Sequence, residues 1–568
     1  MKSYIIKGFF GAIVVWFLFL GVLSIFPIQN PNHVGEDGYQ SNQDNSAELL
    51  KRIDVALQQI QELKKNNAEM KRILGDAHPN ALKTLAASNE VKDEGDGEKV
   101  RESVPQAGDP TYAYEKMRRQ LELDMKELWF TVRGHATSIG TSDFEQIQDI
   151  YRLLRSYLLK LRQEDGYETY RERETQELSK IMQNRINTLQ NPPDCEKAKK
   201  VVCSINKGCG FGCQIHHVVY CMVVAYATSR TLILESKGWR YNRQGWDKVF
   251  LPVSDTCTNA LGSSRADWGS GNHDVQVLTL PIVDFMKPRP PFLPITIPSD
   301  IAGRLEKVHG EPHIWWVGQF VTYLLRMQPQ TQVLLDEAKS KMDISSPTVG
   351  VHVRRTDKVG TEASFHPLKE YMVHVEEYFA IREKYEGPVQ RRVFIASDDP
   401  NVISEASRTY TGSQWQIMGD RTVAQSASVA QRYNGLIGII KDVFLLAECD
   451  YVVCTFSSQV CRLAYEIMQT KHADASGRFV SLDDIYYYGG GSGTIQKAQF
   501  VHKPRSSGEL ELEVGDKIGV AGNHWNGMSK GTNQRTNKVG LYPSYKARNV
   551  FAKVNFPRDK WWTQSGEV

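Results

Sequence analysis

The stretch that decides the fold is Thr348-Val349-Gly350-Val351-His352-Val353-Arg354-Arg355-Thr356-Asp357-Lys358. Its first part, Val349–Val353, is a short run rich in valine, which is typical of a buried β-strand. Two arginines follow this run directly. Ligands of open parallel sheets bind beyond the carboxyl ends of the strands. The stretch therefore predicts a strand that delivers charged side chains to a binding site.

Four other runs have the same character, and helical stretches separate them. The predicted strands are Thr231–Leu234, Val275–Leu280, Arg392–Ala396 and Tyr451–Cys454, and the predicted helices include Gln214–Tyr226, Trp315–Met327 and Val460–Met468. Alternation of strands and helices predicts an α/β body with parallel sheets.

Polar and charged residues also follow two of these strands. Ser397-Asp398-Asp399-Pro400 follows Arg392–Ala396, and Thr455-Phe456-Ser457-Ser458-Gln459 follows Tyr451–Cys454 and opens a helix. Guanidinium groups bind phosphate bidentately, and a helix N-terminus attracts the same anion. Carboxylates accept hydrogen bonds from base edges. Together the strand ends predict a nucleotide-diphosphate site; the alternative is a surface cluster of salt bridges.

The composition excludes several classes of protein. The chain has 568 residues, with 69 Lys+Arg against 66 Asp+Glu and 41% hydrophobic residues. That hydrophobic content excludes a wholly disordered or collagen-like chain. The net charge of +3 argues against a dedicated nucleic-acid binder, which concentrates positive charge on one face.

The N-terminal sequence predicts a membrane anchor. Gly8–Phe26 carries no charge, and at about 1.5 Å per residue it nearly spans a bilayer core of about 30 Å. Two lysines precede it, so the positive-inside rule places 1–7 in the cytosol and everything after the anchor, assigned to 8–28, across the membrane. A cleaved signal peptide is the alternative, but Ile25-Phe26-Pro27 is a poor cleavage site. We expect a single-pass type II membrane protein.

A stem follows at 29–110. Within 49–74 the apolar residues repeat with heptad spacing, which predicts a parallel dimeric coiled coil; a lone amphipathic helix is the alternative. Helical periodicity returns in the segment 111–193, which has a capping-box spacing at Ser142 and ends at Asn191-Pro192-Pro193. We expect these helices to provide core or dimer contacts.

The cysteines indicate an oxidising compartment. Nine are present, five of them between Cys195 and Cys221. A zinc site at Cys209-x3-Cys213, beside His216-His217, is one interpretation of this cluster. Zinc motifs use different spacings, and a lumenal segment permits disulfides, so we favour disulfides over zinc.

Short spacing makes Cys209–Cys213 and Cys454–Cys461 plausible disulfides, although spacing alone does not determine connectivity. Because nine is an odd number, one thiol is left over. Cys449 lies in an apolar run and is the expected buried free cysteine.

At these residues the sequence resembles a known family. The segment His352-Val353-Arg354-Arg355-Thr356-Asp357-Lys358 is similar to the donor-binding motif of the α-1,6-fucosyltransferases that modify the core of N-glycans. The similarity covers the whole chain and includes Glu362-Ala363-Ser364-Phe365-His366-Pro367, Glu466-Ile467-Met468-Gln469-Thr470 and Ser481-Leu482-Asp483-Asp484-Ile485-Tyr486-Tyr487.

The resemblance implies an inverting transferase with a GT-B-like, Rossmann-like body at 194–490. Such an enzyme moves L-fucose from GDP-β-L-fucose to O6 of the innermost, Asn-linked GlcNAc. The implied location is the Golgi membrane, with the catalytic part in the lumen. The resemblance also implies the disulfides Cys195–Cys257 and Cys203–Cys221.

Roles of individual residues follow from the same motifs. The resemblance implies donor contacts by His352, Arg354, Arg355, Asp398, Asp399, Asp442, Tyr241 and Arg432, with Arg354 on the phosphate. It implies acceptor contacts by Lys207, Asp284, Ser458, Gln459 and His524. Glu362 matches the proposed catalytic carboxylate, and Lys358 lies beside it.

The chemistry of inversion agrees with these roles. One base must take the acceptor proton while the diphosphate leaves, and a cation must neutralise the leaving charge. Glu362 and Arg354 fill these roles; a structural ion pair with Lys358 is the alternative for Glu362. The chain contains no Asp-x-Asp motif, and the adjacent Asp398 and Asp399 need not converge on one ion. We therefore expect no metal requirement, and GDP-fucose as a co-substrate.

A second module is predicted at 494–556, after the glycine-rich linker that ends at Gly493. It carries Glu509–Asp516, Asn523–Gly527 and Val539–Tyr545, which look like the hallmarks of an Src-homology-3 (SH3) barrel. SH3 barrels dock proline-rich peptides on an aromatic groove, but here Ala498–His502 replaces the usual opening aromatic stretch. His524, beside Trp525, is then expected to contact the glycan, as the resemblance implies. A barrel used only for packing is the alternative.

Two other functions fit parts of the same sequence. One is a membrane-anchored SH3 adaptor with an inactive transferase body. The other is a fucosyltransferase with a different acceptor, such as a free oligosaccharide or a serine. The intact set of Arg354, Asp442 and Glu362 favours a core fucosyltransferase that acts on N-linked glycans of glycoproteins. The heptads at 49–74 and the helices of 112–189 predict that it is a homodimer.

Overall fold

The computed structural model describes residues 109–290, 292, 296–356, 364–427, 431, 434–488 and 493–556. The expected cytosolic tail, membrane anchor and coiled coil lie outside these residues, and so do Lys358, Glu362 and Arg432. No helix in the described ranges combines the length and the apolar character needed to cross a bilayer.

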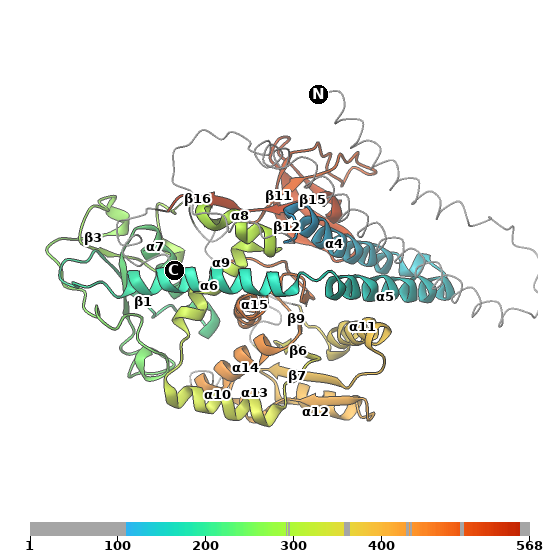
Figure 1. The fold of residues 1–568 in the computed structure, drawn as a ribbon, viewed down its shortest axis with the longest axis horizontal. Coiled ribbons are helices and arrows are strands. Elements are labelled where there is room, and N and C mark those ends of the chain that lie inside the picture. Colours follow the sequence, from blue (N-terminus) through green and yellow to red (C-terminus); the bar gives the residue numbers. More distant parts are fainter. Residues whose placement is uncertain are drawn as a thin grey trace, which may run out of the picture. The chain divides into compact units, whose positions relative to one another are not determined.

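Three long helices precede the α/β body: α4 (Tyr112–Gly134), α5 (Thr141–Glu164) and α6 (Glu168–Gln190) (Figure 1). Thr111 caps α4, because its hydroxyl accepts a hydrogen bond from Tyr114 N. The predicted capping box at Ser142 is wrong: Ser142 lies inside α5, and the N-cap is Gly140, which has no side chain to accept a bond. The predicted end at Asn191 is confirmed, since Asn191 is the C-cap of α6.

The first sheet has four parallel strands in the order β2-β1-β4-β3. They are β1 (Lys200–Ser204), β2 (Thr231–Glu235), β3 (Arg265–Asp267) and β4 (Val277–Thr279). Helix α7 (Phe211–Ala227) connects β1 to β2 and is buried along nearly its whole length. Its sequence is apolar on almost every side, as expected of a helix enclosed in a core.

The second sheet has five parallel strands in the order β10-β9-β6-β7-β8. They are β6 (Thr348–Val353), β7 (Arg391–Ser397), β8 (Trp415–Met418), β9 (Tyr451–Cys454) and β10 (Phe479–Ser481). The connecting helices are α11 (Leu368–Glu386), α12 (Pro400–Thr409), α13 (Arg421–Ser426), α14 (Leu436–Glu448) and α15 (Gln459–Lys471). Two parallel sheets with crossing helices confirm the predicted α/β, GT-B-like body.

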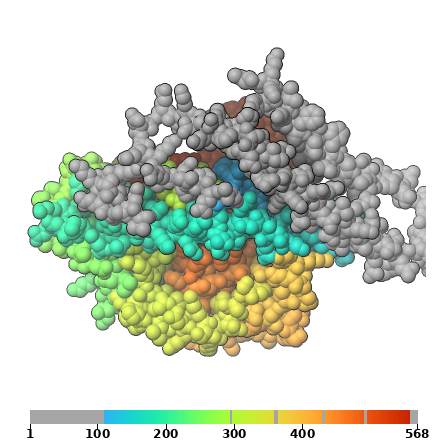
Figure 2. Space-filling view, in the orientation of Figure 1, coloured from blue at the N-terminus to red at the C-terminus, as the bar shows by residue number. Residues whose placement is uncertain are grey.

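The segment between the two sheets contains β5 (Thr296–Pro298), α8 (Ser299–Val308), α9 (Pro312–Leu324) and α10 (Pro329–Met342). Helix α9 packs on both α7 and α15, so helices of the two sheets share one hydrophobic core. The turquoise surface of the α5–α6 region lies against green, yellow and orange surface from later segments (Figure 2). Hydrogen bonds make part of this contact, from Thr175 Oγ1 to Ala473 O and from Gln183 Nε2 to Gln319 O.

The C-terminal strands form a five-stranded antiparallel sheet in the order β14-β13-β12-β11-β15. They are β11 (Ile495–Ala498), β12 (Lys517–Asn523), β13 (Met528–Asn533), β14 (Lys538–Pro543) and β15 (Ala547–Val550), with the 3-10 turn η5 (Ser544–Lys546) before the last. This order is that of an SH3-like barrel, as predicted. Strand β16 (Ala552–Val554) then pairs with β5 of the body.

The barrel is docked on α4, and Figure 1 shows the two side by side. Phe130 of α4 packs on Trp525 of the barrel with ring centroids 5.5 Å apart, and Arg548 pairs with Asp124. Helix α4 also packs on η5. These contacts fix the barrel on α4 and use part of its aromatic surface.

Four disulfides are present among the described residues: Cys195–Cys257, Cys203–Cys221, Cys209–Cys213 and Cys454–Cys461. They join the pairs that short spacing and the resemblance suggest. Cys449 is the free cysteine of the described chain, and it is buried, as expected.

Gly318 permits the close packing of α9 on α15. A Cβ at this position would overlap the main-chain carbonyl oxygen of Glu466, which cannot rotate away. We expect Gly318→Ala to lower the free energy of unfolding by about 1–3 kcal/mol, the usual cost of overpacking a core. Thermal unfolding measures this loss, with Gly477→Ala as the control, because a Cβ at Gly477 meets open space. Equal melting temperatures for the two variants would contradict the prediction.

Candidate active site

The carboxyl ends of β6 and β7 meet in one charged cluster. Asp398, directly after β7, is buried and accepts hydrogen bonds from the segment that follows β6. Its donors are Arg354 Nη1 at 2.6 Å, Arg355 N at 2.8 Å and Thr356 N at 2.9 Å, together with the Thr356 hydroxyl. The Asp398 carboxylate therefore fixes the backbone of 354–356 and orients the Arg354 guanidinium group.

His352 lies one residue before the end of β6 and is buried. Burial, together with the positive charge of Arg354, lowers its pKa to about 4, although Asp398 acts in the opposite direction. The imidazole is therefore neutral at pH 7. Among the described residues its Nδ1 is buried without a hydrogen-bond partner, which is costly unless a ligand supplies one.

Arg355 and Asp399 interact with each other and with α12. Arg355 Nη1 lies 3.8 Å from Asp399 Oδ2 and 3.8 Å from Glu405 Oε2. Asp399 is the N-cap of α12 and accepts a hydrogen bond from Asn401 N at 2.9 Å. These two residues therefore shape the turn beside Asp398.

Asp442 lies in the interior of α14 and is buried. Burial, and then the nearby charge of Asp420, raise the pKa of Asp442 well above its ordinary value. Asp420 caps α13, just beyond the carboxyl end of β8. The polar edge of the second sheet thus continues past β7. Donors from a purine edge would favour the ionised form of the Asp442 carboxyl group.

The turn after β9 is held by the end of the neighbouring strand β10. Asp483 Oδ1 accepts hydrogen bonds from Ser457 N at 3.3 Å and from Ser481 Oγ at 3.1 Å. Ser458 is buried and occupies the N-cap position of α15, but its side chain makes no capping bond. The first turn of α15 therefore keeps N–H groups of the kind that bind anions.

The first sheet contributes a second polar pair. Lys207 follows β1, and Asp284 lies in the short helix η4 (Val283–Phe285) after β4. The structure brings them together, with Lys207 Nζ 2.8 Å from Asp284 Oδ2. Tyr241 is buried near the start of α7, where its hydroxyl accepts a hydrogen bond from Phe211 N at 2.8 Å.

Gln459 connects the two sheets. It is the first residue of α15, and its Oε1 lies 2.8 Å from Nδ1 of His216 in α7. The main chains are also close, because a Cβ on Gly212 would press on the backbone of Gln459. Since α7 follows β1 and α15 follows β9, the carboxyl ends of the two sheets meet at one site.

The SH3-like barrel reaches the same edge of the second sheet. Trp525 Nε1 donates a hydrogen bond to Asp483 O at 2.8 Å, just past β10. His524, the preceding residue, is exposed. The predicted acceptor residue of the barrel therefore lies next to a residue anchored at the candidate site.

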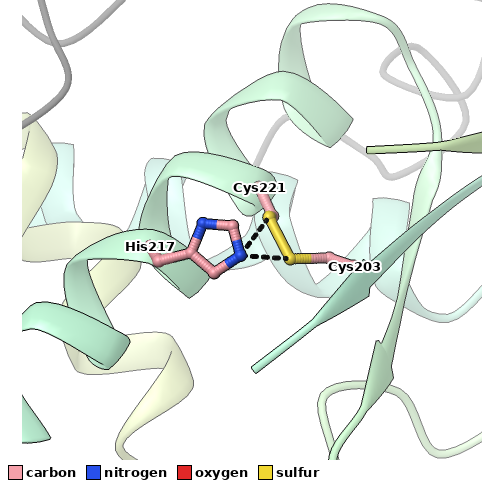
Figure 3. A group of neighbouring side chains, drawn as sticks. All are labelled: Cys203, His217 and Cys221. Carbon is pink, nitrogen blue, oxygen red and sulfur yellow. Dashed lines mark hydrogen bonds between the residues drawn. A yellow bond between two sulfur atoms is a disulfide. The ribbon is translucent and has the colours of Figure 1, made fainter. Parts of the chain in front are cut away.

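Cys203, His217 and Cys221 form a buried cluster between β1 and α7 (Figure 3). His217 Nε2 lies 3.6 Å from Cys203 Sγ and 3.9 Å from Cys221 Sγ. The two sulfur atoms are joined in a disulfide, so neither offers the thiolate that a metal needs. His217 Nε2 also lies 3.0 Å from Ser204 O, to which it donates. In this state the cluster supports β1 and α7 and does not form a metal site.

The sequence-based predictions missed His216, Glu466 and Asp483. Glu466 and Asp483 lie inside the family motifs, but no role was assigned to them. His216 is a buried polar residue in an otherwise apolar helix, and that contrast is the signal that identifies it.

Comparison with known proteins identifies the family of the chain. A family model described as alpha-(1,6)-fucosyltransferase N- and catalytic domains matches residues 4–487. An alpha-(1,6)-fucosyltransferase of Drosophila melanogaster is 42% identical over 604 residues, which covers 96% of this chain and 96% of the relative. One from Caenorhabditis elegans is 40% identical over 455 residues, covering 78% of this chain and 80% of the relative. A crystal structure of the fucosyltransferase NodZ from Bradyrhizobium is 14% identical with a TM-score of 0.30, covering 47% of this chain and 92% of that one; a likeness so slight carries no argument.

The buried His352 predicts a loss of stability in acid. Its pKa of about 4 in the fold lies below the ordinary value of 6.5, so its contribution is fully present above pH 6.5 and is lost as the pH falls through about 4. His352→Gln, which does not titrate, should reduce the slope of unfolding free energy against pH in this window, by up to about 1.4 kcal/mol per pH unit. Urea unfolding at a series of pH values measures the slope. An unchanged slope would mean that His352 takes up its proton equally in both states.

Proposed function

Because the chain belongs to the α-(1,6)-fucosyltransferase family, we propose that it transfers L-fucose from GDP-β-L-fucose to O6 of the innermost, Asn-linked GlcNAc of N-glycans. The structural observation that carries the proposal is the cluster at the end of β6, where Asp398 orients Arg354. A guanidinium group held at the end of a buried strand is well placed to bind a diphosphate.

In the proposed reaction the bond between fucose C1 and the β-phosphate oxygen breaks, while a bond from GlcNAc O6 to C1 forms with inversion. The O6 proton passes to Glu362, near Lys358 in the sequence, and GDP leaves with added negative charge. Arg354 neutralises that charge, so its contact strengthens in the transition state. Asp398 holds Arg354 in place beforehand, which reduces the reorganisation needed during the reaction.

The other donor contacts are proposed around the same edge of the second sheet. His352 offers a buried neutral nitrogen, and Asp442 offers a carboxyl group for the N–H donors of guanine. Arg355 and Asp399 form the turn next to Asp398. Tyr241 and Arg432 complete the proposed donor set, together with Arg354 and Asp398.

Acceptor contacts are proposed for Lys207, Asp284, Ser458, Gln459 and His524. The ion pair of Lys207 and Asp284 presents both a donor and an acceptor for sugar hydroxyl groups. The anchoring of Trp525 at the end of β10 supports a contact between the neighbouring His524 and the glycan.

We propose that the reaction requires no metal ion. Arg354 supplies the positive charge that opposes the leaving diphosphate. The two adjacent carboxylates have other partners: Asp398 holds the segment 354–356, and Asp399 caps α12. They are therefore not arranged to share an ion.

We also propose a single-pass type II protein of the Golgi membrane, with the catalytic part in the lumen. The uncharged run Gly8–Phe26 supports the anchor. The disulfides among the described residues support an oxidising compartment.

We propose a homodimer that uses the helices α4 and α5. Exposed apolar side chains form one stripe on each helix: Met117, Leu121 and Leu128 on α4, and Ile150, Leu154 and Leu161 on α5. The spacing is the same in both and places the members of each stripe on one helix face. Exposed stripes of this kind mark association surfaces.

A different acceptor is the nearest alternative function. The adaptor alternative is disfavoured, because α4 packs on η5 and Phe130 packs on Trp525, so part of the aromatic surface of the barrel is already in use.

The catalytic pair gives the central test. Arg354→Ala should reduce fucose transfer to a core N-glycopeptide on the order of 10²-fold or more, and Arg354→Lys should not restore it, because a point charge cannot make a bidentate contact. Glu362→Gln should keep GDP affinity and lose transfer about 10²–10⁴-fold, as expected for a general base. Calorimetry with GDP and a transfer assay provide the two measurements.

The same assay includes two controls, and one outcome would refute the role of Arg354. EDTA should leave transfer unchanged, and a strict dependence on Mn²⁺ would refute the proposal on metals. Transfer to a free oligosaccharide or a serine peptide, but not to the glycopeptide, would establish the alternative acceptor. Normal turnover by Arg354→Ala would refute the assignment of the phosphate contact.

The dimer is tested on a chain that begins at residue 105, which leaves out the predicted coiled coil. Leu121→Lys and Leu154→Lys should convert the dimer into a monomer, because each buries a charge in the proposed interface. Leu159→Lys is the matched control: Leu159 is also exposed on α5 but lies off the stripe. Sedimentation at micromolar concentration distinguishes the states. A monomeric parent chain, or a dimer that survives both substitutions, would contradict the proposal.

A further inference from the structure

His216 lies at the centre of a buried chain of hydrogen bonds that the proposed reaction does not use. Its Nδ1 faces Gln459 Oε1 at 2.8 Å, and its Nε2 faces the two oxygens of Glu466 at 3.1 and 3.0 Å. The side chain of His216 is 4% exposed and that of Glu466 is fully buried. The chain of contacts therefore runs from the first residue of α15, through α7, and back to Glu466 in the middle of α15.

The far end of this chain is also fixed. Tyr486 donates its hydroxyl hydrogen to Glu466 Oε1 at 2.7 Å, and Tyr488 donates to the main-chain carbonyl of His216. Gly212, one turn before His216, lies close to the backbone of Gln459. Neither the imidazole nor the carboxylate can swing away without leaving a buried polar group unpaired.

The acceptors around His216 set the direction of its hydrogen bonds. The amide oxygen of Gln459 can only accept, so His216 Nδ1 donates to it, while Nε2 lies against the Glu466 carboxylate. The amide oxygen of Gln459 is thereby committed to His216. Its NH₂ group has no hydrogen-bond partner among the described residues, and the side chain is half-buried at the N-terminus of α15.

We propose that His216 is a positioning residue of the transferase: it holds the Gln459 amide with its oxygen inward, so that the NH₂ group donates to an oxygen of the acceptor sugar. The inference rests on the proposed function. It goes beyond that function because it names the Gln459 side chain as the hydrogen-bond donor to the acceptor sugar. Glu466 and Tyr486 maintain the orientation of the ring. A hydrogen bond to a fixed donor favours one pose of the acceptor, and a displacement of about 1 Å can cost on the order of 10²-fold in rate.

Two substitutions at His216 separate its two contacts and serve as matched controls for each other. The side-chain amide of His216→Asn reaches the place of Nδ1 and can still donate to Gln459. That of His216→Gln reaches the place of Nε2 and keeps the contact with Glu466. We expect His216→Asn to keep kcat/KM for the glycopeptide acceptor within about threefold, and His216→Gln to lower it on the order of tenfold, the effect of one lost hydrogen bond. The KM for GDP-fucose should stay unchanged in both.

A double-mutant cycle shows whether His216 acts through Gln459. In a Gln459→Ala background, His216→Gln should cause no further loss, because its target is gone. Gln459→Glu gives a second test that leaves the core intact: its carboxylate still accepts from His216 but offers no NH₂ group, so it should lose acceptor kcat/KM as Gln459→Ala does.

Failure of the inference and failure of the proposed function give different results. Equal losses for His216→Asn and His216→Gln, additive losses in the cycle, or full activity of Gln459→Glu would each overturn the inference while wild-type transfer remains. If His216→Gln does not fold, the result with Gln459→Glu decides alone. Wild-type protein that transfers no fucose to the glycopeptide would overturn the proposed function, and the inference with it.

Discussion

The common direction of the strands in β10-β9-β6-β7-β8 is the constraint on which the site depends. Parallel strands end at the same edge, so the residues after β6, β7, β9 and β10 must lie next to one another, although they are far apart in sequence. Electrostatic interactions then fix the side chains at this edge. Asp398 cannot be buried as a charge without partners, and it obtains them from Arg354 and the backbone of 355–356. The requirement to satisfy one buried carboxylate thus places Arg354, the arginine proposed to bind the diphosphate.

A second buried carboxylate needs hydrogen-bond partners where the two sheets meet. A buried Glu466 needs donors, and it finds them in His216 and Tyr486. Because His216 belongs to α7, which follows the first strand of the first sheet, this contact links the first sheet to the start of α15. The SH3-like barrel is joined to the carboxyl edge of the second sheet by the hydrogen bond from Trp525 to Asp483. A module that elsewhere binds peptides here forms a fixed part of the site's surroundings.

A structural element could be predicted from the sequence where a single segment carried all the evidence for it. The valine-rich run before Arg354 predicts β6 because every residue of that strand is buried. Strand β1 was missed because it begins with Lys200, a buried lysine whose Nζ donates to Leu261 O at 2.6 Å. The charged residues after β6 and β7 could be predicted as a binding site, but the pairing of Arg354 with Asp398 depends on the order of strands. His216 could not be assigned a role, since its partners Gln459 and Glu466 lie 243 and 250 positions away along the chain.

The shared core of α7, α9 and α15 restricts how the molecule can move. Two-domain enzymes often admit ligands by a hinge motion that separates the domains. Here such an opening would expose apolar surface common to both sheets and would break the buried hydrogen bonds between His216 and Glu466. The shared core therefore opposes a hinge motion between the two sheets, and ligand exchange that leaves this core closed avoids that cost.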